Sequence, residues 1–512
     1  MKLNRAIYQS LLIISFLAIN ALIIFGISAV WSYLNTGADR SKMLHLPEAL
    51  ASSYIPEIKW DLENIEGRPI ENQTLNEIEK DYLKSWQVRN IALETNNKFG
   101  LSDYFTDSAR VKLYQLIDLN QMQKTSLKST TLKHQPKLEF YSADGKLAIL
   151  TDRDVLQFQE NYLENVLVYS QKTISTIRVM LLLEDGFWRV RHMVVLESKN
   201  IEHLATSSKK RHNMDWSLIK GVNYYPQQNP WDMFGKNFKD TTIHNDLEKI
   251  KEVGLNTIRV FVPYEAFGKA EIDVVKLDQL YRTLDIASRH DLKVMVTLFD
   301  FYGDYRIHDW TLTFRHAEQI VKRIKDHPAL LGWDLKNEPD LDFASRGKSN
   351  VLSWLEQLIE EVNNWDGNHP VTIGWSNADA AEHLSQKVDF VSFHYYLNPD
   401  SFSDTYTNLK KRVPNKPIVL QEYGLSSYSG LWNLYRGSTK KQANYFEKMH
   451  KEISSLNIPY LFWTFYDFED VPNSVVGRLP WRKAKQKNFG LLDKEGRPKK
   501  ALESIKESIK KE

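Results

Sequence analysis

The chain of 512 residues contains no cysteine. Disulfide bonds, thiolate zinc sites, iron–sulfur clusters and cysteine nucleophiles are therefore excluded together. Neither charge sign is in large excess, because 67 Lys and Arg residues face 65 Asp and Glu residues and leave a net charge of +2. Such a balance gives no general electrostatic reason to bind nucleic acid. The sequence also lacks a His-Glu-x-x-His pattern or another cluster with metal-ligand spacing, so it implies neither a metal nor a cofactor.

Charge is also absent from one long stretch near the N-terminus. Residues 6–38 contain no charged side chain, and residues 11–34 are nearly all Leu, Ile, Phe, Ala and Val. At about 1.5 Å per residue a helix over this run crosses the ~30 Å of bilayer hydrocarbon. The apolar region of a cleavable signal is shorter. We therefore expect an N-terminal segment 1–42 with an uncleaved transmembrane span over about 7–34. Cleavage after the 28–29 region is the less favoured alternative.

The orientation of this span is only weakly encoded. Lys2 and Arg5 precede it, while Arg40 and Lys42 follow it, so the positive-inside rule barely discriminates. A very short N-terminal segment before a single span favours a cytoplasmic N-terminus, with the rest of the chain on the other side of the membrane. We expect a single-pass membrane protein whose catalytic part is extracytoplasmic, as in a bacterial inner-membrane protein that faces the periplasm.

Residues 54–197 show helical spacing first and strand patterns afterwards. Asp-Gly pairs at 144–145 and 185–186 are each flanked by strand-like runs, which predicts two hairpins. Helices followed by an antiparallel sheet indicate a small α+β domain. Its order, and the closing Glu-Asp-Gly-Phe-Trp-Arg-Val at 184–190, resembles the NTF2-like cone fold. No polar cluster here demands catalysis, so we expect a spacer or docking domain, followed by a polar linker over 198–213.

The pattern changes in residues 214–512, where apolar strand-like runs alternate with helical stretches. Near-continuous apolar strands separated by helices indicate parallel strands buried on both faces. Eight such units predict an α/β fold, the (β/α)8 TIM barrel. The fifth and sixth runs lie close together, which predicts a small helix between them. The runs are residues 218–223, 257–262, 293–298, 330–335, 371–374, 388–393, 417–420 and 460–464.

A barrel places its reacting groups where its strands end. Run four is followed by Trp-Asp-Leu-Lys-Asn-Glu-Pro at 333–339, and run seven by Val-Leu-Gln-Glu-Tyr-Gly at 419–424. Glu338 and Glu422 are thus expected at the same rim, on strands that face each other. Retaining cleavage of a glycosidic bond needs one carboxylic acid and one carboxylate about 5–5.5 Å apart. Either Glu alone is an ordinary strand-end residue, but the pair at matching strand ends is a specific signal.

The pattern over residues 215–505 resembles glycoside hydrolase clan A, the retaining barrel enzymes with a Glu on strands four and seven. Within the clan it is most similar to family 5, of cellulase and mannanase type, or to the barrel domain of family 2. The resemblance implies that Glu338 is the acid/base and Glu422 the nucleophile. It implies that Asn337 binds the substrate's 2-hydroxyl and that Arg259, on strand two, keeps the nucleophile ionised.

The resemblance extends to strands six and eight. His394 and Tyr396 match a His-x-Tyr pattern, and the strand period of two puts both on one face, within reach of Glu422. Trp463 matches the Trp that floors the subsite of the cleaved sugar, and residues 488–493 resemble the family's closing segment. Other residues that follow strands one, three and eight are expected near the cleft: Asn223, Tyr224, Tyr225, Trp231, Asp300, Tyr302, Asp467 and Glu469.

One feature departs from family 5. Many of its enzymes carry a His after strand three, whereas here no His follows that run before His308. The family below the level of the clan therefore stays open, and the substrate with it.

These observations predict a membrane-anchored retaining glycoside hydrolase that cleaves a β-linked polysaccharide or oligosaccharide by double displacement, without a cofactor. Two alternatives stay open: a transglycosylase with the same residues, and a non-catalytic glycan-binding subunit of an envelope polysaccharide assembly system. Retention of Glu338, Glu422 and Asn337 argues against the second, because binding alone needs no acid/base pair. The expected partners are a β-linked glycan, the membrane through the N-terminal helix, and envelope polysaccharide machinery through the middle domain.

Overall fold

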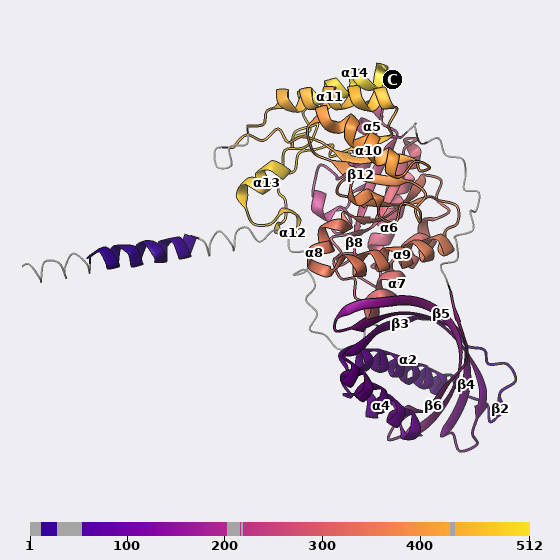
Figure 1. Cartoon of the computed structure of the whole chain (residues 1–512). Coiled ribbons are helices and arrows are strands. Elements are labelled where there is room, and N and C mark those ends of the chain that lie inside the picture. The colour runs from indigo at the N-terminus through magenta and orange to yellow at the C-terminus, as the bar shows by residue number, and fades with distance from the viewer. Residues whose placement is uncertain (1–11, 28–53, 202–215, 217–218, 431–435, 512) are drawn as a thin grey trace, which may run out of the picture.

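The computed structural model describes residues 12–27, 54–201, 216, 219–430 and 436–511 (Figure 1). The predicted membrane span over about 7–34 is described only in part: residues 12–27 form an exposed helix, and the remainder lies outside the described residues. Among the described ranges no helix has the length and apolar character that crossing a bilayer requires, because the helix of residues 12–27 is shorter than the predicted span. Most of the predicted linker, from residue 202 on, also lies outside them.

The N-terminal α+β region packs helices against a strongly curved sheet, as Figure 1 shows for α2 and α4. Both Asp-Gly turns join antiparallel neighbours, β3 with β4 and β5 with β6, as predicted. The sheet order is β1-β3-β4-β5-β6, with β2 beside β3. The elements are α2 (Asn72–Thr95), α3 (Leu101–Tyr104), α4 (Asp107–Gln123), β1 (Glu57–Ile58), β2 (Glu66–Gly67), β3 (Thr125–Tyr141), β4 (Leu147–Leu163), β5 (Val166–Glu184) and β6 (Phe187–Asn200).

The inner face of this sheet is filled by side chains rather than left open. Trp86 and Tyr82 of α2 are fully buried against sheet residues such as Leu150 and Val179. The region is therefore held by its own apolar core. Its resemblance to the NTF2-like cone fold stays a prediction.

The second region is a closed barrel of eight parallel strands, which confirms the predicted (β/α)8 architecture. Its strands are apolar on both sides because one side lines the barrel interior and the other packs under the surrounding helices. The strands, in barrel order, are β7 (Lys220–Asn223), β8 (Thr257–Pro263), β9 (Lys293–Asp300), β10 (Leu330–Asn337), β11 (Val371–Trp375), β12 (Val391–Tyr395), β13 (Ile418–Tyr423) and β14 (Tyr460–Phe462).

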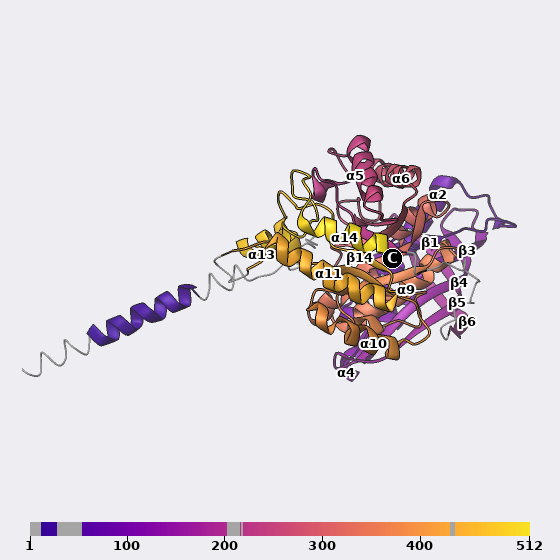
Figure 2. The same ribbon diagram turned by 90° about the horizontal axis from the view of Figure 1, so that it is seen from above.

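Helices surround this barrel, and Figure 2 shows α5, α6, α10, α11 and α14 around it. As expected, the connection between β11 and β12 holds only a short helical turn, η6 (Ala380–Glu382). The other helices are α5 (Asp240–Glu252), α6 (Val274–Arg289), α7 (Trp310–Ile324), α8 (Phe343–Arg346), α9 (Lys348–Trp365), α10 (Phe402–Arg412), α11 (Thr439–Leu456), α12 (Asn473–Val476), α13 (Pro480–Gln486), α14 (Lys500–Lys511), η3 (Pro230–Asp232), η4 (Ile307–Asp309), η5 (Pro339–Asp342) and η7 (Pro399–Ser401).

The barrel interior changes character along its axis. An apolar cluster that includes Ile219, Met295, Val419 and Leu461 fills it where the strands begin. Charged and amide side chains replace the apolar ones toward the strands' carboxyl ends. The polar residues of the barrel interior therefore gather at one rim, and the candidate site lies there.

Candidate active site

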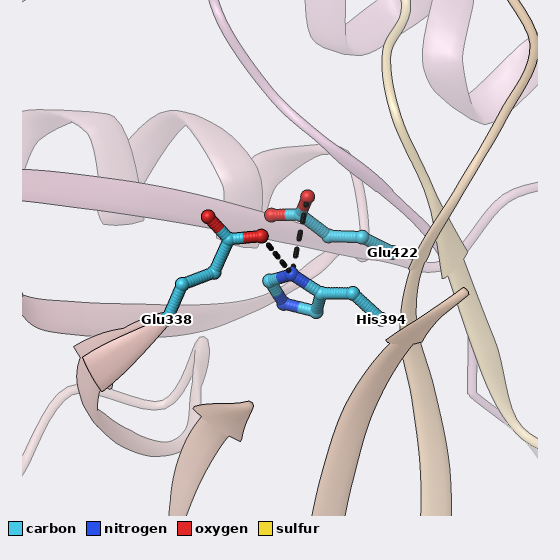
Figure 3. Close-up of side chains that lie close together, drawn as sticks. All are labelled: Glu338, His394 and Glu422. Carbon is cyan, nitrogen blue, oxygen red and sulfur yellow. Dashed lines mark hydrogen bonds and ion pairs between the residues drawn. The ribbon is translucent and has the colours of Figure 1, made fainter. Parts of the chain in front are cut away.

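Glu338 and Glu422 converge at the carboxyl rim of the barrel. Glu338 directly follows β10, and Glu422 lies in β13 across the barrel. One oxygen of each carboxylate lies within 4.8 Å of the other, and both side chains point toward His394 (Figure 3). This spacing suits a nucleophile and an acid that act on one sugar carbon, and it leaves less room than the 6.5–9.5 Å that an inverting water needs.

Both oxygens of the Glu422 carboxylate accept hydrogen bonds. Arg259 donates to Oε1 over 2.6 Å, and the Tyr396 hydroxyl donates to Oε2 over 2.7 Å. Partial burial, and then the charge of Glu422, raises the pKa of Tyr396 above its ordinary value, so the phenol stays protonated and keeps its role as donor. The carboxylate is thereby fixed in orientation and compensated by a cation.

Arg259 also forms hydrogen bonds with several other side chains. Its side chain is fully buried and donates to Asp334 (2.6 Å), Asn223 (2.9 Å) and Asn337 (2.9 Å). Burial alone would lower the pKa of Arg259, but Asp334 and Glu422 outweigh it and raise that pKa. The guanidinium therefore stays charged, and its planar set of donors fixes the direction in which it meets Glu422.

The side chains of Asn223 and Asn337 connect different strands through hydrogen bonds. Asn223 accepts from Arg259 and donates to the carbonyl oxygens of Gln421 (2.9 Å) and Phe462 (3.2 Å), so it ties β7 to β13 and β14. Asn337 accepts from Arg259 at the end of β10. Both predicted residues thus lie in the site and position its charged groups.

Asp334 is a site residue that the sequence interpretation missed. It is fully buried, accepts from Arg259 and Thr297, and accepts the backbone N–H of Gly374 over 2.8 Å. A carboxylate inside an apolar strand run needs a cationic partner, since an unpaired buried charge is very costly. That rule applied to run four would have pointed to Asp334, four residues before Glu338.

Glu338 has a different environment from Glu422. Its side chain is 22% exposed, against 6% for Glu422, and its Oε1 lies 3.0 Å from Nδ1 of His394. Its backbone adopts a left-handed conformation with φ +47°, which is uncommon outside glycine and typical of functional positions. The more accessible carboxyl group is the one that a leaving group and then a water molecule can reach.

His394 lies between the two carboxylates, with Nδ1 3.0 Å from Glu338 and 3.5 Å from Glu422. Burial alone would lower the pKa of His394, but Glu422 and Glu338 outweigh it and raise that pKa. Its Nε2 lies 3.4 Å from Oε1 of Gln421. The imidazole thus bridges the two carboxylates and is oriented by β13.

Glu338, His394 and Glu422 also form the one group of potential metal ligands in the described ranges. The cation of Arg259 already contacts Glu422 at 2.6 Å, and Tyr396 donates to the other oxygen of that carboxylate. A divalent ion would compete with both and be repelled by the buried guanidinium. The donor set therefore fits proton transfer and nucleophilic attack better than metal binding.

The barrel that carries this site also matches a protein-family model. Residues 219–469 match the model of the cellulase family, glycosyl hydrolase family 5. This barrel belongs to glycosyl hydrolase family 5. The family 5 match contains Asn223, Arg259, Glu338, Glu422 and Trp463, and it excludes the α+β region.

Curated relatives align with the family 5 domain at low identity. Human β-glucuronidase is 24% identical over 314 residues, which cover 57% of this chain and 44% of the relative. A probable mannan endo-1,4-β-mannosidase C from Aspergillus terreus is 25% identical over 248 residues, covering 37% and 60%. A solved exo-β-1,4-mannosidase from Opitutaceae bacterium strain TAV5 is 19% identical, covers 57% of this chain and 59% of that one, and has a TM-score of 0.46. The chain spans less than half the length of the β-glucuronidases it matches.

An aromatic wall stands beside the carboxylates of the family 5 domain. Trp463, Tyr225 and Phe468 share one apolar cluster, against which Trp231 packs. Burial raises the pKa of Tyr225 well above its ordinary value, with a further contribution from Asp300, to which its hydroxyl donates. Trp463, Tyr225, Trp231 and Asp300 therefore all lie on the side of the site next to β7, β9 and β14.

Four further residues that the sequence placed near the cleft have other surroundings. Tyr224 donates to Asp246 of α5 over 2.9 Å, and Tyr302 is buried among Trp354 and other aromatic rings. Asp467 binds Lys499 over 2.6 Å, and Glu469 is exposed. Position after a strand end does not by itself aim a side chain at the barrel axis, because alternate residues point toward the helices.

Proposed function

We propose that the chain is a retaining β-glycosidase that acts by double displacement. A Glu422 oxygen attacks the anomeric carbon and forms a glycosyl ester, while the bond to the leaving oxygen breaks and Glu338 gives that oxygen its proton. Water then loses a proton to Glu338, its oxygen bonds to the anomeric carbon, and Glu422 departs as a carboxylate. The close approach of the two carboxylates carries this proposal.

The different surroundings of the carboxylates support the roles. Glu422 is buried and bound through both oxygens to Arg259 and Tyr396, as suits an ionised nucleophile whose direction must be fixed. Glu338 is more exposed and lies next to His394, as suits a group that exchanges protons with leaving group and water. Asn337, held by Arg259, lies next to the acid and is proposed to bind the 2-hydroxyl of the substrate.

The bond to be cleaved is proposed to be β-linked and to lie in a polysaccharide or oligosaccharide. The curated relatives named above are, by name, β-mannosidases and β-glucuronidases, which supports this configuration. Sugar identity and endo or exo action are left to a hydrolysis screen over β-linked glucans, mannans and galactans.

Replacement of Glu422 by Ala tests the proposal. The variant should lose turnover of any substrate found in the screen by a factor of about 10⁴ or more, because no covalent intermediate forms, while sugar binding is largely kept. The exposed Glu469→Ala, also at the carboxyl rim, is the matched control and should keep wild-type rates. Unchanged hydrolysis by Glu422→Ala contradicts the mechanism.

Product analysis separates hydrolysis from transfer. A transglycosylase would use the same glycosyl ester, intercepted by a sugar hydroxyl instead of water, and would give longer products when an acceptor sugar is added. Tight glycan binding without cleavage or transfer over the whole panel would point instead to a non-catalytic glycan-binding subunit.

We also propose, from the uncharged run over residues 6–38, that the protein is anchored in a membrane with its barrel outside the cytoplasm. A partner for the α+β region in envelope polysaccharide machinery is a proposal that depends on this location. Membrane fractionation, followed by protease digestion of intact spheroplasts, tests both the anchor and its orientation. A protein that stays in the soluble fraction, or that resists the protease until the cells are broken, contradicts it.

A further inference from the structure

The loop between β9 and α7, residues 301–309, joins the candidate site to the α+β region. It begins directly after Asp300, the last residue of β9 at the carboxyl rim, and it ends before Trp310, the first residue of α7. Figure 1 shows α7 next to the sheet of the α+β region. This segment, the β9–α7 loop, therefore begins at the candidate site and ends at the contact between the two regions.

Contacts with the α+β region hold the far end of the β9–α7 loop. The ring of Phe158 in β4 lies 4.7 Å from that of Trp310, which is fully buried. Within the loop, His308 lies 3.3 Å from Glu94 of α2. Phe158 and Trp310 belong to the same apolar cluster as the core of the barrel. Because such a core is close-packed, this end of the loop cannot shift without opening contacts between the two regions.

Trp310 also holds the middle of the β9–α7 loop. Its indole N–H donates to the carbonyl oxygen of Tyr305 over 3.1 Å. The ring of Tyr305 is buried and packs edge-on against Trp354 of α9, with the ring centres 5.3 Å apart. Its hydroxyl donates to the buried carboxylate of Asp342 over 2.5 Å. A hydrogen bond to a carboxylate is stronger than one between neutral groups. Tyr305 therefore links the β9–α7 loop firmly to η5.

Asp342 ends the turn that begins with Glu338. Glu338 immediately precedes η5, and its left-handed backbone, with φ +47°, is retained only where the surrounding structure holds it. Two carboxylates of the turn supply such bonds. Asp340 accepts a backbone N–H at the end of β11 over 2.9 Å, and Asp342 accepts from Tyr305. The direction of the Glu338 side chain thus depends on the β9–α7 loop.

We propose that the α+β region positions the carboxyl group of Glu338 through the β9–α7 loop. The path runs over four side chains, which are positioning residues: Phe158, Trp310, Tyr305 and Asp342. This inference rests on the proposed glycosidase function, in which Glu338 is the acid, and it adds the residues that aim this acid at the leaving oxygen. The alternative is that the α+β region only covers α7 and α9. These contacts would then stabilise the fold and leave the acid unaffected.

The dependence of hydrolysis on the leaving group reports the position of the acid. A basic leaving oxygen needs the proton of a well-placed acid, whereas an acidic one leaves almost without it. The test therefore compares phenyl with dinitrophenyl β-glycosides of the mono- and disaccharides of the glucan, mannan and galactan series, with the full chain as enzyme. The readout is the ratio of kcat/KM on the phenyl glycoside to that on the dinitrophenyl glycoside, because kcat/KM reports the transition state in which the glycosidic bond breaks.

Tyr305→Phe removes the hydroxyl that holds Asp342 and keeps the ring. Its kcat/KM should fall about tenfold on the phenyl glycoside and stay within about twofold on the dinitrophenyl glycoside, because only the first needs the acid in place. Tyr302→Phe is the matched control. Tyr302 is buried with its ring 5.4 Å from that of Tyr305, and its hydroxyl has no hydrogen-bond partner among the described residues. A wild-type ratio in Tyr305→Phe, or an equal change in both variants, overturns the proposal.

A second pair of variants tests the contribution of the α+β region itself. Phe158→Leu removes the ring that packs on Trp310 but keeps an apolar side chain, and it should lower the same ratio by about threefold or more. Lys172→Gln breaks the ion pair with Glu360 of α9, which also joins the two regions but does not involve the β9–α7 loop. This control should keep the wild-type ratio. Denaturant unfolding verifies that each variant is folded. A wild-type ratio in Phe158→Leu overturns the proposal.

Hydrogen exchange measured by mass spectrometry keeps the failure of this proposal distinct from that of the glycosidase function. The backbone N–H of Glu338 donates to Gly374 over 2.6 Å, so its exchange reports the opening of the turn without any substrate. Tyr305→Phe and Phe158→Leu should speed exchange about tenfold in peptides that contain residues 338–342, and the two control variants should not.

Unchanged exchange in either test variant overturns the positioning role even if no glycoside of the panel is hydrolysed. A wild type that hydrolyses none of them, while exchange rises as expected in both test variants, counts against the glycosidase function and supports the positioning of the turn. Hydrolysis by the wild type with an unchanged ratio in the test variants leaves the glycosidase intact and refutes only the role of the α+β region.

Discussion

At the scale of single residues, Arg259 is the centre of the site. Its guanidinium bonds to one group that would form a covalent bond, Glu422, and to another that never meets substrate, Asp334. Asp334 uses both its oxygens, one for Arg259 and Thr297 and the other for the backbone of Gly374. Asp334 is therefore a positioning residue that acts on Glu422 through Arg259.

Replacement of Asp334 by Asn tests this role. The amide is nearly isosteric but removes the charge that Arg259 faces, so the guanidinium should turn toward Glu422 and shift it. We expect kcat to fall by about 10²-fold with KM changed by less than about threefold, because the loss concerns orientation in the transition state. Steady-state kinetics on the best substrate of the screen measure both.

A buried carboxylate outside the site provides the control. Asp366 is 2% exposed and accepts a hydrogen bond from the indole N–H of Trp333 over 2.8 Å. Trp333 precedes Asp334 in the sequence, but its side chain lies on the outer side of β10. Asp366→Asn should cost stability and leave kcat near the wild-type value. If both variants lower kcat equally, Asp334 serves the stability of the fold and not the positioning of Arg259.

At the scale of elements, the hydrogen bonds at the end of β11 require a close approach of β11 to β10 and to the Arg259 cluster. Gly374 donates its N–H to Asp334 and accepts from the N–H of Glu338 over 2.6 Å, so it joins the end of β10 to β11. A Cβ at this position would lie 2.5 Å from Gln421 and 2.9 Å from Arg259. No side chain fits there without displacing the hydrogen-bonded cluster.

We therefore expect Gly374→Ala to damage the site as well as the fold. Overpacking of this kind costs about 1–3 kcal/mol of stability, and the displaced Arg259 should lower kcat/KM by about 10²-fold. Gly186→Ala, in the hairpin turn of the α+β region, is the control. A Cβ there has nothing within 4 Å, but φ is +84°. It should cost about 1 kcal/mol through backbone strain without changing kcat/KM. Chemical denaturation and kinetics on the three proteins decide this point.

At the scale of the whole molecule, the α+β region packs against the barrel helices α7 and α9 (Figure 1). The ring of Phe158 lies 4.7 Å from that of Trp310, and Lys172 pairs with Glu360 at 2.5 Å. His308, just after the third barrel strand, lies 3.3 Å from Glu94 of α2. The α+β region therefore packs directly on the barrel, and the loop after β9 is among its contacts.

His308 makes this contact dependent on pH. Burial alone would lower the pKa of His308, but Glu94 and then Asp309 outweigh it and raise that pKa. A raised pKa in the folded state stabilises the fold fully below the unfolded pKa of about 6.5, and this stabilisation is lost as the pH rises through the folded value.

Unfolding measured by denaturant should therefore show a wild type that loses stability from this contact as the pH rises above about 6.5. His308→Gln should be less stable at the lower pH and should lack this loss. His192→Gln, at an exposed position of the α+β region, should keep the wild-type pH profile. Profiles of equal slope for the wild type and His308→Gln contradict the assignment.

The sequence by itself determined the barrel and the placement of Glu338 and Glu422 at one rim. A strand buried on both sides must be apolar throughout, so the eight runs stood out without tertiary information, and the local motifs around Glu338 and Glu422 assigned the strand ends. Tertiary structure alone decided how the other groups are used. Asp334 meets Arg259 and Asp467 meets Lys499 because distant strands and loops pack there. The physical reason is that burial pattern is a local property of the chain, whereas the partner of a charged side chain depends on residues far away in sequence.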